Sequence, residues 1–343
     1  ARLWEVETEI EPKFFARSRG AVHVSEVILL MFTPDGKQLL SGNGGGDVDL
    51  WDVETRQVVQ SSGFGAGLIN AMVFSPTGEF VLTAGGDGTA TLWDSQSGQP
   101  VRLFTGHVGP IWDATLSPDG KTVLTGGEDS AARLWDVQSG ATIYQFSGHV
   151  GPLRSVAFSP DGRLGLTGGA DATARLWDLE TGVEIRQFTG HSGLVRSVAF
   201  AANGRFVLTG SDDFTARLWD LDSGKVVQQF TGHTGHVLTA VFSPDGRYVL
   251  TGSADRTVRL WDIETGQVVR QFPGHRNPVG TLTFSPDSQF VLAAELEAGY
   301  LWRISLGDII TIACEQLGRD FTSEERALYT ITGDEPTCPL SGQ

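Results

Sequence analysis

The stretch His233–Phe272, HTGHVLTAVFSPDGRYVLTGSADRTVRLWDIETGQVVRQF, decides the fold of this chain. It holds four short apolar runs, and turn-forming residues such as Ser-Pro-Asp-Gly and Thr-Gly separate them. Runs of this length and composition are typical of β-strands. The stretch therefore predicts one four-stranded antiparallel meander.

The same pattern returns along the chain with a period of 42 residues. Trp-Asp pairs begin at Trp51, Trp93, Trp135, Trp177, Trp219 and Trp261, and a further Trp302 follows after 41 residues. Gly-His pairs keep the same step at His107, His149, His191, His233 and His275. A fixed period of this length indicates stacked supersecondary units, each of which buries its face on its neighbours.

Each unit resembles the WD40 repeat, whose family fold is the β-propeller. The resemblance covers roughly residues 1–303, and it rests on six Trp-Asp pairs, five Gly-His pairs and five Ser-Pro dipeptides in register. It implies an all-β, seven-bladed WD40 β-propeller with one blade for each Trp. A closed ring of this kind leaves no exposed sheet ends.

The ring needs one further strand, because blade 7 has no recognisable fourth strand after Trp302. Residues 8–16, TEIEPKFFA, align with Thr265–Pro273, so we expect them to close the ring as the outer strand of blade 7. Arg2–Thr8 look like the end of a preceding repeat. They belong either to an eighth, incomplete blade or to a longer protein from which the chain was cut.

The C-terminal segment, residues 304–343, leaves the repeat and predicts a small helical extension packed on the propeller. Apolar residues at helical spacing predict a helix over Asp308–Leu317, and a capping-box pattern predicts another over Ser323–Tyr329. Cys314 and Cys338 are candidates for a disulfide, or for two thiols in a reducing compartment. The segment resembles the tails of bacterial WD40 proteins of the STAND-type signalling class, through Ala313-Cys314, Gly318-Arg319, Thr322, Glu325, Tyr329 and Cys338.

The composition narrows the range of partners. The chain has 343 residues and a net charge of −16, from 41 acidic and 25 basic residues. Nucleic acids and anionic membrane surfaces both attract basic proteins, so we expect neither as a partner. No stretch approaches the length of a transmembrane helix, and no signal-peptide core is present, so we expect a cytoplasmic location.

Four residues of each unit look catalytic at first sight, because a hydroxyl, an imidazole and a carboxylate recur together with Trp. The WD40 resemblance implies that they form a structural tetrad, a hydrogen-bonded chain from Trp to Thr to His to Asp. Because the same four residue types recur in four repeats, we expect a structural role for them. A catalytic triad needs instead one site with an accessible nucleophile and an oxyanion pocket. The four sets are His107, Thr125, Asp129, Trp135; His149, Thr167, Asp171, Trp177; His191, Thr209, Asp213, Trp219; and His233, Thr251, Asp255, Trp261.

The tetrad is degraded around the ring closure. Gly65 replaces the His of blade 2, Gly45 replaces the Asp of blade 1, and Ala293 replaces the hydroxyl residue of blade 7. We expect these three blades to be the least rigid. Asp47 and Asp49 have the spacing of the start of a calcium loop, but the remaining ligands do not follow, so we expect a solvated turn. We predict no metal ion and no cofactor.

When the repeats are aligned with one another, each position forms a column. A column that varies while its neighbours stay constant is not needed for the fold, so its residues can contact a partner. In the first strand, an invariably aliphatic column is followed by one that changes class at almost every step. In the WD40 family this variable column lies near the entrance of the central channel, on the top face. Together with nearby loop residues it gives the candidate partner-binding residues Asn70, Trp112, Glu128, Arg154, Arg196, Asp212, Phe214, His236, Leu238 and Arg256.

These residues favour a non-enzymatic protein–protein interaction platform, in keeping with the sensor propeller of a bacterial signalling protein. Trp and Arg are enriched at binding hot spots. Arg154, Arg196 and Arg256 suit a segment with acidic or phosphorylated groups, and Trp112 and Phe214 supply apolar anchors. In the alternative interpretation these are ordinary surface residues, some of which pair with Glu128 or Asp212. Two other functions stay open: a small-ligand or enzymatic propeller that uses Glu26, Glu128, Asp212 and His236, and a structural assembly unit.

Overall fold

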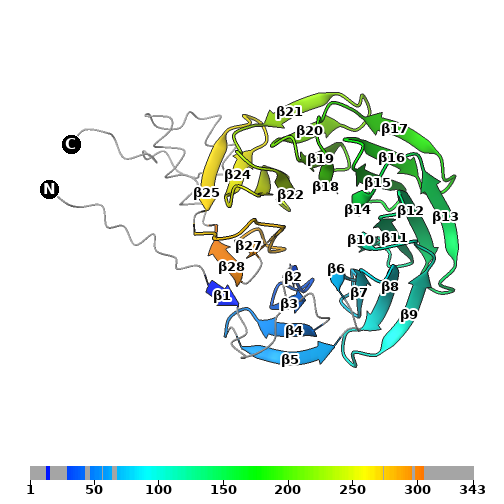
Figure 1. Cartoon of the computed structure of the whole chain (residues 1–343). Helices are drawn as coiled ribbons and strands as arrows, with labels where there is room; N and C mark the ends of the chain where they lie inside the picture. Colours follow the sequence, from blue (N-terminus) through cyan, green and yellow to red (C-terminus); the bar gives the residue numbers. More distant parts are fainter. Residues whose placement is uncertain are drawn as a thin grey trace, which may run out of the picture.

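The computed structural model is a ring of seven four-stranded antiparallel sheets, the blades, around a central axis (Figure 1). The structure describes residues 13–15, 29–42, 47–55, 57–63, 68–272, 274–295 and 298–304. Within six of the sheets the strand order follows the chain, as the meander pattern requires. The all-β, seven-bladed propeller predicted from the repeat is therefore confirmed.

Each blade takes four strands, which run from the axis outward. Blade 1 contains β2 (Leu29–Phe32), β3 (Gln38–Gly42), β4 (Asp47–Asp52) and β5 (Val58–Gly63). Blade 2 contains β6 (Ile69–Phe74), β7 (Phe80–Gly85), β8 (Thr89–Asp94) and β9 (Pro100–Thr105). Blade 3 contains β10 (Ile111–Leu116), β11 (Thr122–Gly127), β12 (Ala131–Asp136) and β13 (Thr142–Ser147). Blade 4 contains β14 (Leu153–Phe158), β15 (Leu164–Gly169), β16 (Ala174–Asp178) and β17 (Glu184–Phe188).

The remaining blades repeat this order until the ring closes. Blade 5 contains β18 (Val195–Phe200), β19 (Phe206–Ser211), β20 (Ala216–Asp220) and β21 (Val226–Phe230). Blade 6 contains β22 (Val237–Phe242), β23 (Tyr248–Ser253), β24 (Val258–Asp262) and β25 (Val268–Phe272). Blade 7 contains β26 (Thr281–Phe284), β27 (Phe290–Glu295), β28 (Ala298–Arg303) and β1 (Lys13–Phe15).

The outer strand of blade 7 comes from the other end of the chain. β1 pairs antiparallel with β28 through Lys13–Leu301, Phe14–Tyr300 and Phe15–Gly299. In Figure 1 the blue β1 accordingly lies beside the orange β28. The rest of the predicted closing segment, the residues 1–7 and the whole of 305–343, with Cys314 and Cys338, lie outside the described residues. The domain boundaries and the helical extension stay predictions.

The core lies in the seams between neighbouring blades. The aliphatic column of the first strand is buried wherever the structure describes it, and its members from Ile111 to Val279 are at most 1% exposed. In blades 2 to 6 a Phe near the end of the outer strand packs against the Trp of the next blade, as Phe146 does against Trp177 with ring centroids 5.2 Å apart. Apolar contact of this kind holds each blade to its neighbour.

The antiparallel meander gives the ring two unlike faces. The Ser-Pro-Asp-Gly turns, such as the one at Ser159–Gly162, lie at one end of the blades, which we term the bottom face. The Gly-His connections and the turns that carry the tetrad Asp lie at the other end, the top face. Gly162 has a φ of 71°, a value that favours glycine, which explains the recurrence of Gly in the bottom turns.

Candidate functional site

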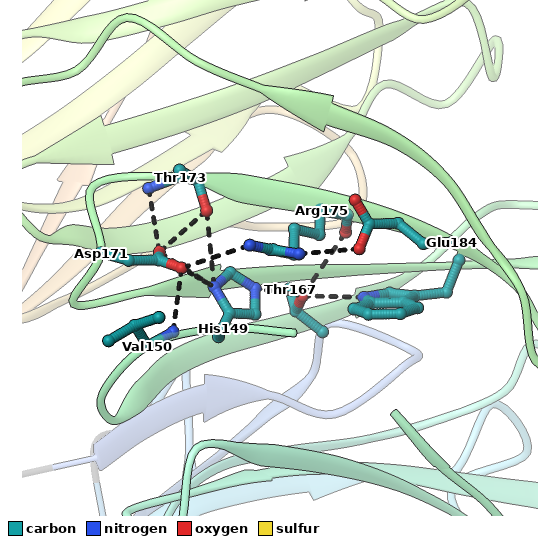
Figure 2. A network of polar contacts seen from close by, with 8 residues as sticks. His149, Val150, Thr167, Asp171, Thr173, Arg175 and Glu184 are labelled. Carbon is teal, nitrogen blue, oxygen red and sulfur yellow. Dashed lines mark hydrogen bonds and ion pairs between the residues drawn. The ribbon is translucent and has the colours of Figure 1, made fainter. Parts of the chain in front are cut away.

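The structural tetrad of blade 4 forms one continuous hydrogen-bonded chain (Figure 2). Trp177 Nε1 donates to Thr167 Oγ1 at 2.9 Å, and that oxygen lies 2.8 Å from His149 Nε2. His149 Nδ1 lies 3.0 Å from the Asp171 carboxylate, which also accepts the backbone N–H of Val150. Both ring nitrogens of a buried imidazole are thereby satisfied, as burial demands.

The same chain recurs in blades 3, 5 and 6. Each His Nε2 lies 2.7–2.8 Å from a Thr hydroxyl, and each Nδ1 lies 2.7–2.9 Å from an Asp carboxylate. Burial lowers the pKa of all four His residues below the ordinary value, although the Asp partners oppose this shift. Burial alone would raise the pKa of Asp171, but the hydrogen bonds from His149 and Thr173 outweigh it and lower that pKa.

These tetrads are unsuited to nucleophilic catalysis at their hydroxyls. Thr125, Thr167, Thr209 and Thr251 are all 0% exposed. Each hydroxyl is already engaged between the Trp indole and the His imidazole. A nucleophile must reach its substrate, and these buried, engaged hydroxyls cannot. The tetrads instead tie the top-face loops to the sheets.

The variable column of the first strand sits on a β-bulge. The pairing of β10 with β11 shifts between Ile111 and Asp113, which leaves Trp112 unpaired. Blades 2, 4, 5 and 6 have the same shift, at Asn70, Arg154, Arg196 and Leu238. A bulge frees one residue from the ladder and re-aims its side chain. The bulge explains why this column varies beside a constant buried one.

Three candidate residues of blades 3 and 4 form a stack on the top face. The Arg154 guanidinium lies 3.8 Å from the centroid of the Trp112 ring, a cation–π contact. Trp112 Nε1 donates to the Glu128 carboxylate at 2.6 Å. Burial lowers the pKa of Arg154, with the charge of Arg196 acting in the same direction and Glu128 opposing. The Arg154 Nε is buried without a hydrogen-bond partner.

A second group of candidates joins blades 5 and 6. Arg196 makes a two-pronged ion pair with Asp212, through Nε to Oδ1 and through Nη2 to Oδ2 at 2.9 Å. His236 Nδ1 lies 2.9 Å from the Asp212 carbonyl oxygen, and the His236 ring meets Phe214 edge-on at 5.4 Å. The second Arg of the expected positive patch is therefore neutralised by a carboxylate of its own blade.

The remaining candidates are placed separately. Asn70 donates from Nδ2 to the Ile111 carbonyl of the next blade at 2.8 Å. Leu238 is half-buried on the bulge of blade 6, and Arg256 is exposed in the turn between β23 and β24. Of the residues proposed for an enzymatic site, Glu26 lies outside the described residues, Glu128 accepts from Trp112, and Asp212 contacts both Arg196 and His236, whose Nδ1 lies 3.3 Å from Asp212 Oδ1.

The model of one protein family, described as WD domain, G-beta repeat, matches six segments that cover more than half of the chain. The segments are residues 57–94, 98–136, 140–178, 182–220, 224–262 and 266–297. The chain belongs to the WD40 family. No curated protein matches it. The seven-bladed ring extends the six matched repeats by blade 1, most of which precedes the first matched segment.

In blades 3 to 6 an Arg precedes the Trp by two residues: Arg133, Arg175, Arg217 and Arg259. Its regular repetition predicts a role in the architecture of the blade surface, and the structure adds that it pairs with the tetrad Asp in blades 3, 4 and 5. Arg133 is only 8% exposed, and its Nη1 lies 2.7 Å from the Asp129 carboxylate. Arg175 lies 3.7 Å from Asp171 and 2.8 Å from Glu184. The sequence shows that this Arg recurs in register with the tetrad, but only the structure shows that it contacts the tetrad Asp.

Blade 7 replaces the WD40 tetrad with a different buried cluster. Glu295, 4% exposed, accepts the hydroxyl of Tyr300 at 2.6 Å and the backbone N–H groups of Arg276 and Asn277 at 2.9 Å each. His275 Nδ1 lies 3.6 Å from the Glu295 carboxylate, and burial lowers the pKa of His275. The one-residue deletion in this repeat hid Glu295 from column comparison.

Blades 1 and 2 keep the first bond of the tetrad. Trp51 donates to Ser41 and Trp93 to Thr83, each at 2.8 Å. The expectation of a solvated turn at Asp47 and Asp49 is wrong, because both residues lie in β4 and Asp49 is 6% exposed. Gly45 and Gly65 lie outside the described residues, and the rigidity of these blades stays a prediction.

Two absences hold for the part of the chain that the structure describes. It contains no group of three or more His, Cys, Asp or Glu residues placed to hold a metal ion. It also contains no helix that is long and apolar enough to span a membrane.

Proposed function

We propose that this WD40 propeller is a non-enzymatic platform that binds a protein segment on its top face, across blades 3 to 6. The propeller would serve as the sensor or regulatory part of a bacterial signalling protein in the cytoplasm. Its net charge of −16 argues against nucleic acid and membrane surfaces as partners. WD40 propellers are commonly used for protein–protein interaction, and the proposal adds which residues engage the partner.

One observation carries the proposal, namely the contrast between Arg154 and its neighbours. In blades 3 and 5 the side chain at the β-bulge has an acidic partner 16 residues later in the sequence. Glu128 accepts a hydrogen bond from Trp112, and Asp212 forms an ion pair with Arg196. In blade 4 that position is Ala170. No carboxylate among the described residues lies within ion-pair distance of Arg154.

The environment of Arg154 defines the partner's chemistry. The guanidinium is held over the Trp112 ring, so little side-chain freedom is lost when it binds. Partial burial with no ion-pair partner makes a carboxylate or phosphate favourable there. The exposed Phe214, in the top-face turn of the next blade, offers a contact for an apolar side chain of the same segment. We infer a segment that presents one acidic or phosphorylated residue next to an apolar one.

Phe214 supports the same conclusion through its exposure. Its φ of 70° belongs to the turn itself, because Ser130, Ala172 and Arg256 hold the equivalent positions with φ values of 62–67°. What differs in blade 5 is the side chain, a large apolar ring that is 42% exposed. An exposed aromatic ring on the top face is available to a partner.

The test is a selection of peptides from a displayed library on the wild-type protein, followed by fluorescence-polarisation titration of the enriched peptides. We expect enrichment of peptides that carry an acidic residue beside an apolar one. Arg154→Ala should weaken their binding at least tenfold, in line with a charged hot-spot contact of about 1.4 kcal/mol or more. Arg163→Ala removes the same charge from an exposed bottom turn and should change nothing. Equal binding to both variants would remove Arg154 from the site.

A further inference from the structure

Six of the seven seams between blades are closed near the bottom face by the second residue after the blade's Trp. This residue is aliphatic in those blades and packs into the core shared with the preceding blade: Val53, Val137, Leu179, Leu221, Ile263 and Ile304. Blade 2 alone has a polar residue there, Ser95. Its hydroxyl donates to the Gly78 carbonyl at 2.7 Å, so it leaves the apolar space unfilled.

A cavity of about 260 Å³ opens at this seam, between blades 1 and 2; we term it the seam cavity. Its apolar walls are Leu40, Val48 and Leu50 of blade 1 and Phe74 and Val81 of blade 2. Leu40, Val48 and Val81 are at most 3% exposed, so the cavity reaches the depth of the core. Polar but uncharged residues, among them Gln38, Ser95 and Gln96, line the rest.

The seam between blades 3 and 4 differs from the seam cavity in depth and in charge. There Leu179 stands at the position of Ser95 and Gly165 at the position of Val81, and an added Cβ on Gly165 would lie 2.9 Å from Leu179 Cδ2. A hollow of about 490 Å³ remains at this seam, but it is lined by Leu134, Leu179 and charged residues such as Asp161 and Arg163. It does not reach Leu124 or Ala132, the equivalents of Leu40 and Val48.

The substitution at Ser95 is not compensated by a larger neighbour. Val81 and Ser95 both line the seam cavity, and the column of Val81 holds Val123, Val207 and Val249 in blades 3, 5 and 6, whose closing residue is aliphatic; only blade 4 combines an aliphatic closing residue with Gly165. The sequence of blade 1 also has Ser62 where the outer strands of blades 2 to 6 have the Phe that packs on the next Trp. Trp93 of blade 2 is half-buried, whereas Trp135 is 1% exposed.

We propose that the seam cavity is a binding site for a small neutral molecule with an apolar body of benzene to indole size and one hydrogen-bonding group. A dry apolar cavity of about 150 Å³ holds benzene, and ligand pockets begin at about 300 Å³, so the volume suits a ligand of this size. No lining residue is charged, and burial of an ion without a partner is costly. Gln38 and Gln96 place amide groups where the ligand's polar group would lie.

The seam cavity lies at the bottom face, away from Arg154, so it stands independently of the top-face proposal. Its test uses benzyl alcohol and benzoate, two probes of similar shape that differ in charge, in ligand-detected NMR titrations. We expect saturable binding of benzyl alcohol to the wild type and none of benzoate. Ser95→Leu places in blade 2 the side chain that blades 4 and 5 carry. It should weaken benzyl alcohol binding at least tenfold and raise the melting temperature by a few degrees.

Two further variants keep the test decisive. Ser192→Leu makes the same change in an exposed top-face loop and should leave benzyl alcohol binding unchanged. Ser95→Val, which installs the residue of blades 1 and 3, replaces Ser95→Leu if leucine prevents folding. The proposal is overturned if benzyl alcohol does not saturate on the wild type, if it binds the filled variant equally well, or if benzoate binds as tightly.

Discussion

The tetrad hydroxyl of blade 5 offers the sharpest test of how the ring is held together. Thr209 is 0% exposed, accepts the Trp219 indole N–H at 2.9 Å and lies 2.7 Å from His191 Nε2. Thr209→Val keeps the shape of the side chain but leaves both groups buried and unpaired. Each such group costs about 1–3 kcal/mol, so the free energy of unfolding should fall by about 2–6 kcal/mol.

Urea denaturation followed by far-UV circular dichroism measures this loss through the midpoint shift. The matched control is Thr142→Val, because Thr142 is exposed on the outer strand β13. That change should stay within about 0.5 kcal/mol of the wild type. If Thr209→Val also stays within that range, the tetrad does not stabilise the blade and the reasoning is wrong.

Three further predictions concern pH and backbone strain. Burial lowers the pKa of His107, His149, His191 and His233, so below pH 6.5 the unfolded state binds more protons than the folded state. Calorimetry should therefore show a melting temperature that is constant above about pH 7.5 and falls as the pH drops through 6.5. A melting temperature that stays constant down to pH 5 would contradict this. Burial raises the pKa of Asp113 to about 6, so its stabilising contribution is complete below pH 3.8 and lost as pH rises through 6. Ser155 makes the equivalent backbone bond in blade 4, so Ser can replace Asp113. The unfolding free energy of Asp113→Ser, relative to that of the wild type, should rise by up to about 3 kcal/mol when the pH is raised from 4 to 8. An equal effect of the substitution at both pH values would refute this prediction. Phe214→Gly should raise the unfolding free energy by about 1 kcal/mol through relief of strain while weakening binding of the selected peptides, and a stability loss would show that Phe214 packs rather than binds.

The period of 42 residues made the fold predictable, because constant columns mark the seams and turns of every blade. The aliphatic column from Ile69 to Val279 was identified from sequence as core, and the structure buries it. Where a repeat changes length, column comparison fails, as it did for Glu295 in blade 7. Asp49 was misjudged for a related reason, since the tetrad Asp of blade 1 is missing and the neighbouring acid suggested a turn.

The candidate site was harder to predict than the fold. Sequence comparison found the variable column but not the β-bulge that frees it, because a bulge depends on the register between strands. It also could not decide between three free Arg side chains and paired ones. The spacing of 16 residues that joins Trp112 to Glu128 and Arg196 to Asp212 was visible in the sequence, yet only side-chain geometry shows that both bonds form.

The most direct test of the top-face proposal is the affinity of one selected acidic peptide for the wild type, Arg154→Ala and Arg163→Ala, measured at two salt concentrations. The account predicts at least tenfold weaker binding to Arg154→Ala only, with a smaller salt dependence in that variant, because one charge-assisted contact is gone. Equal affinity and equal salt dependence for all three proteins would contradict the claim that Arg154 receives the partner's acidic group.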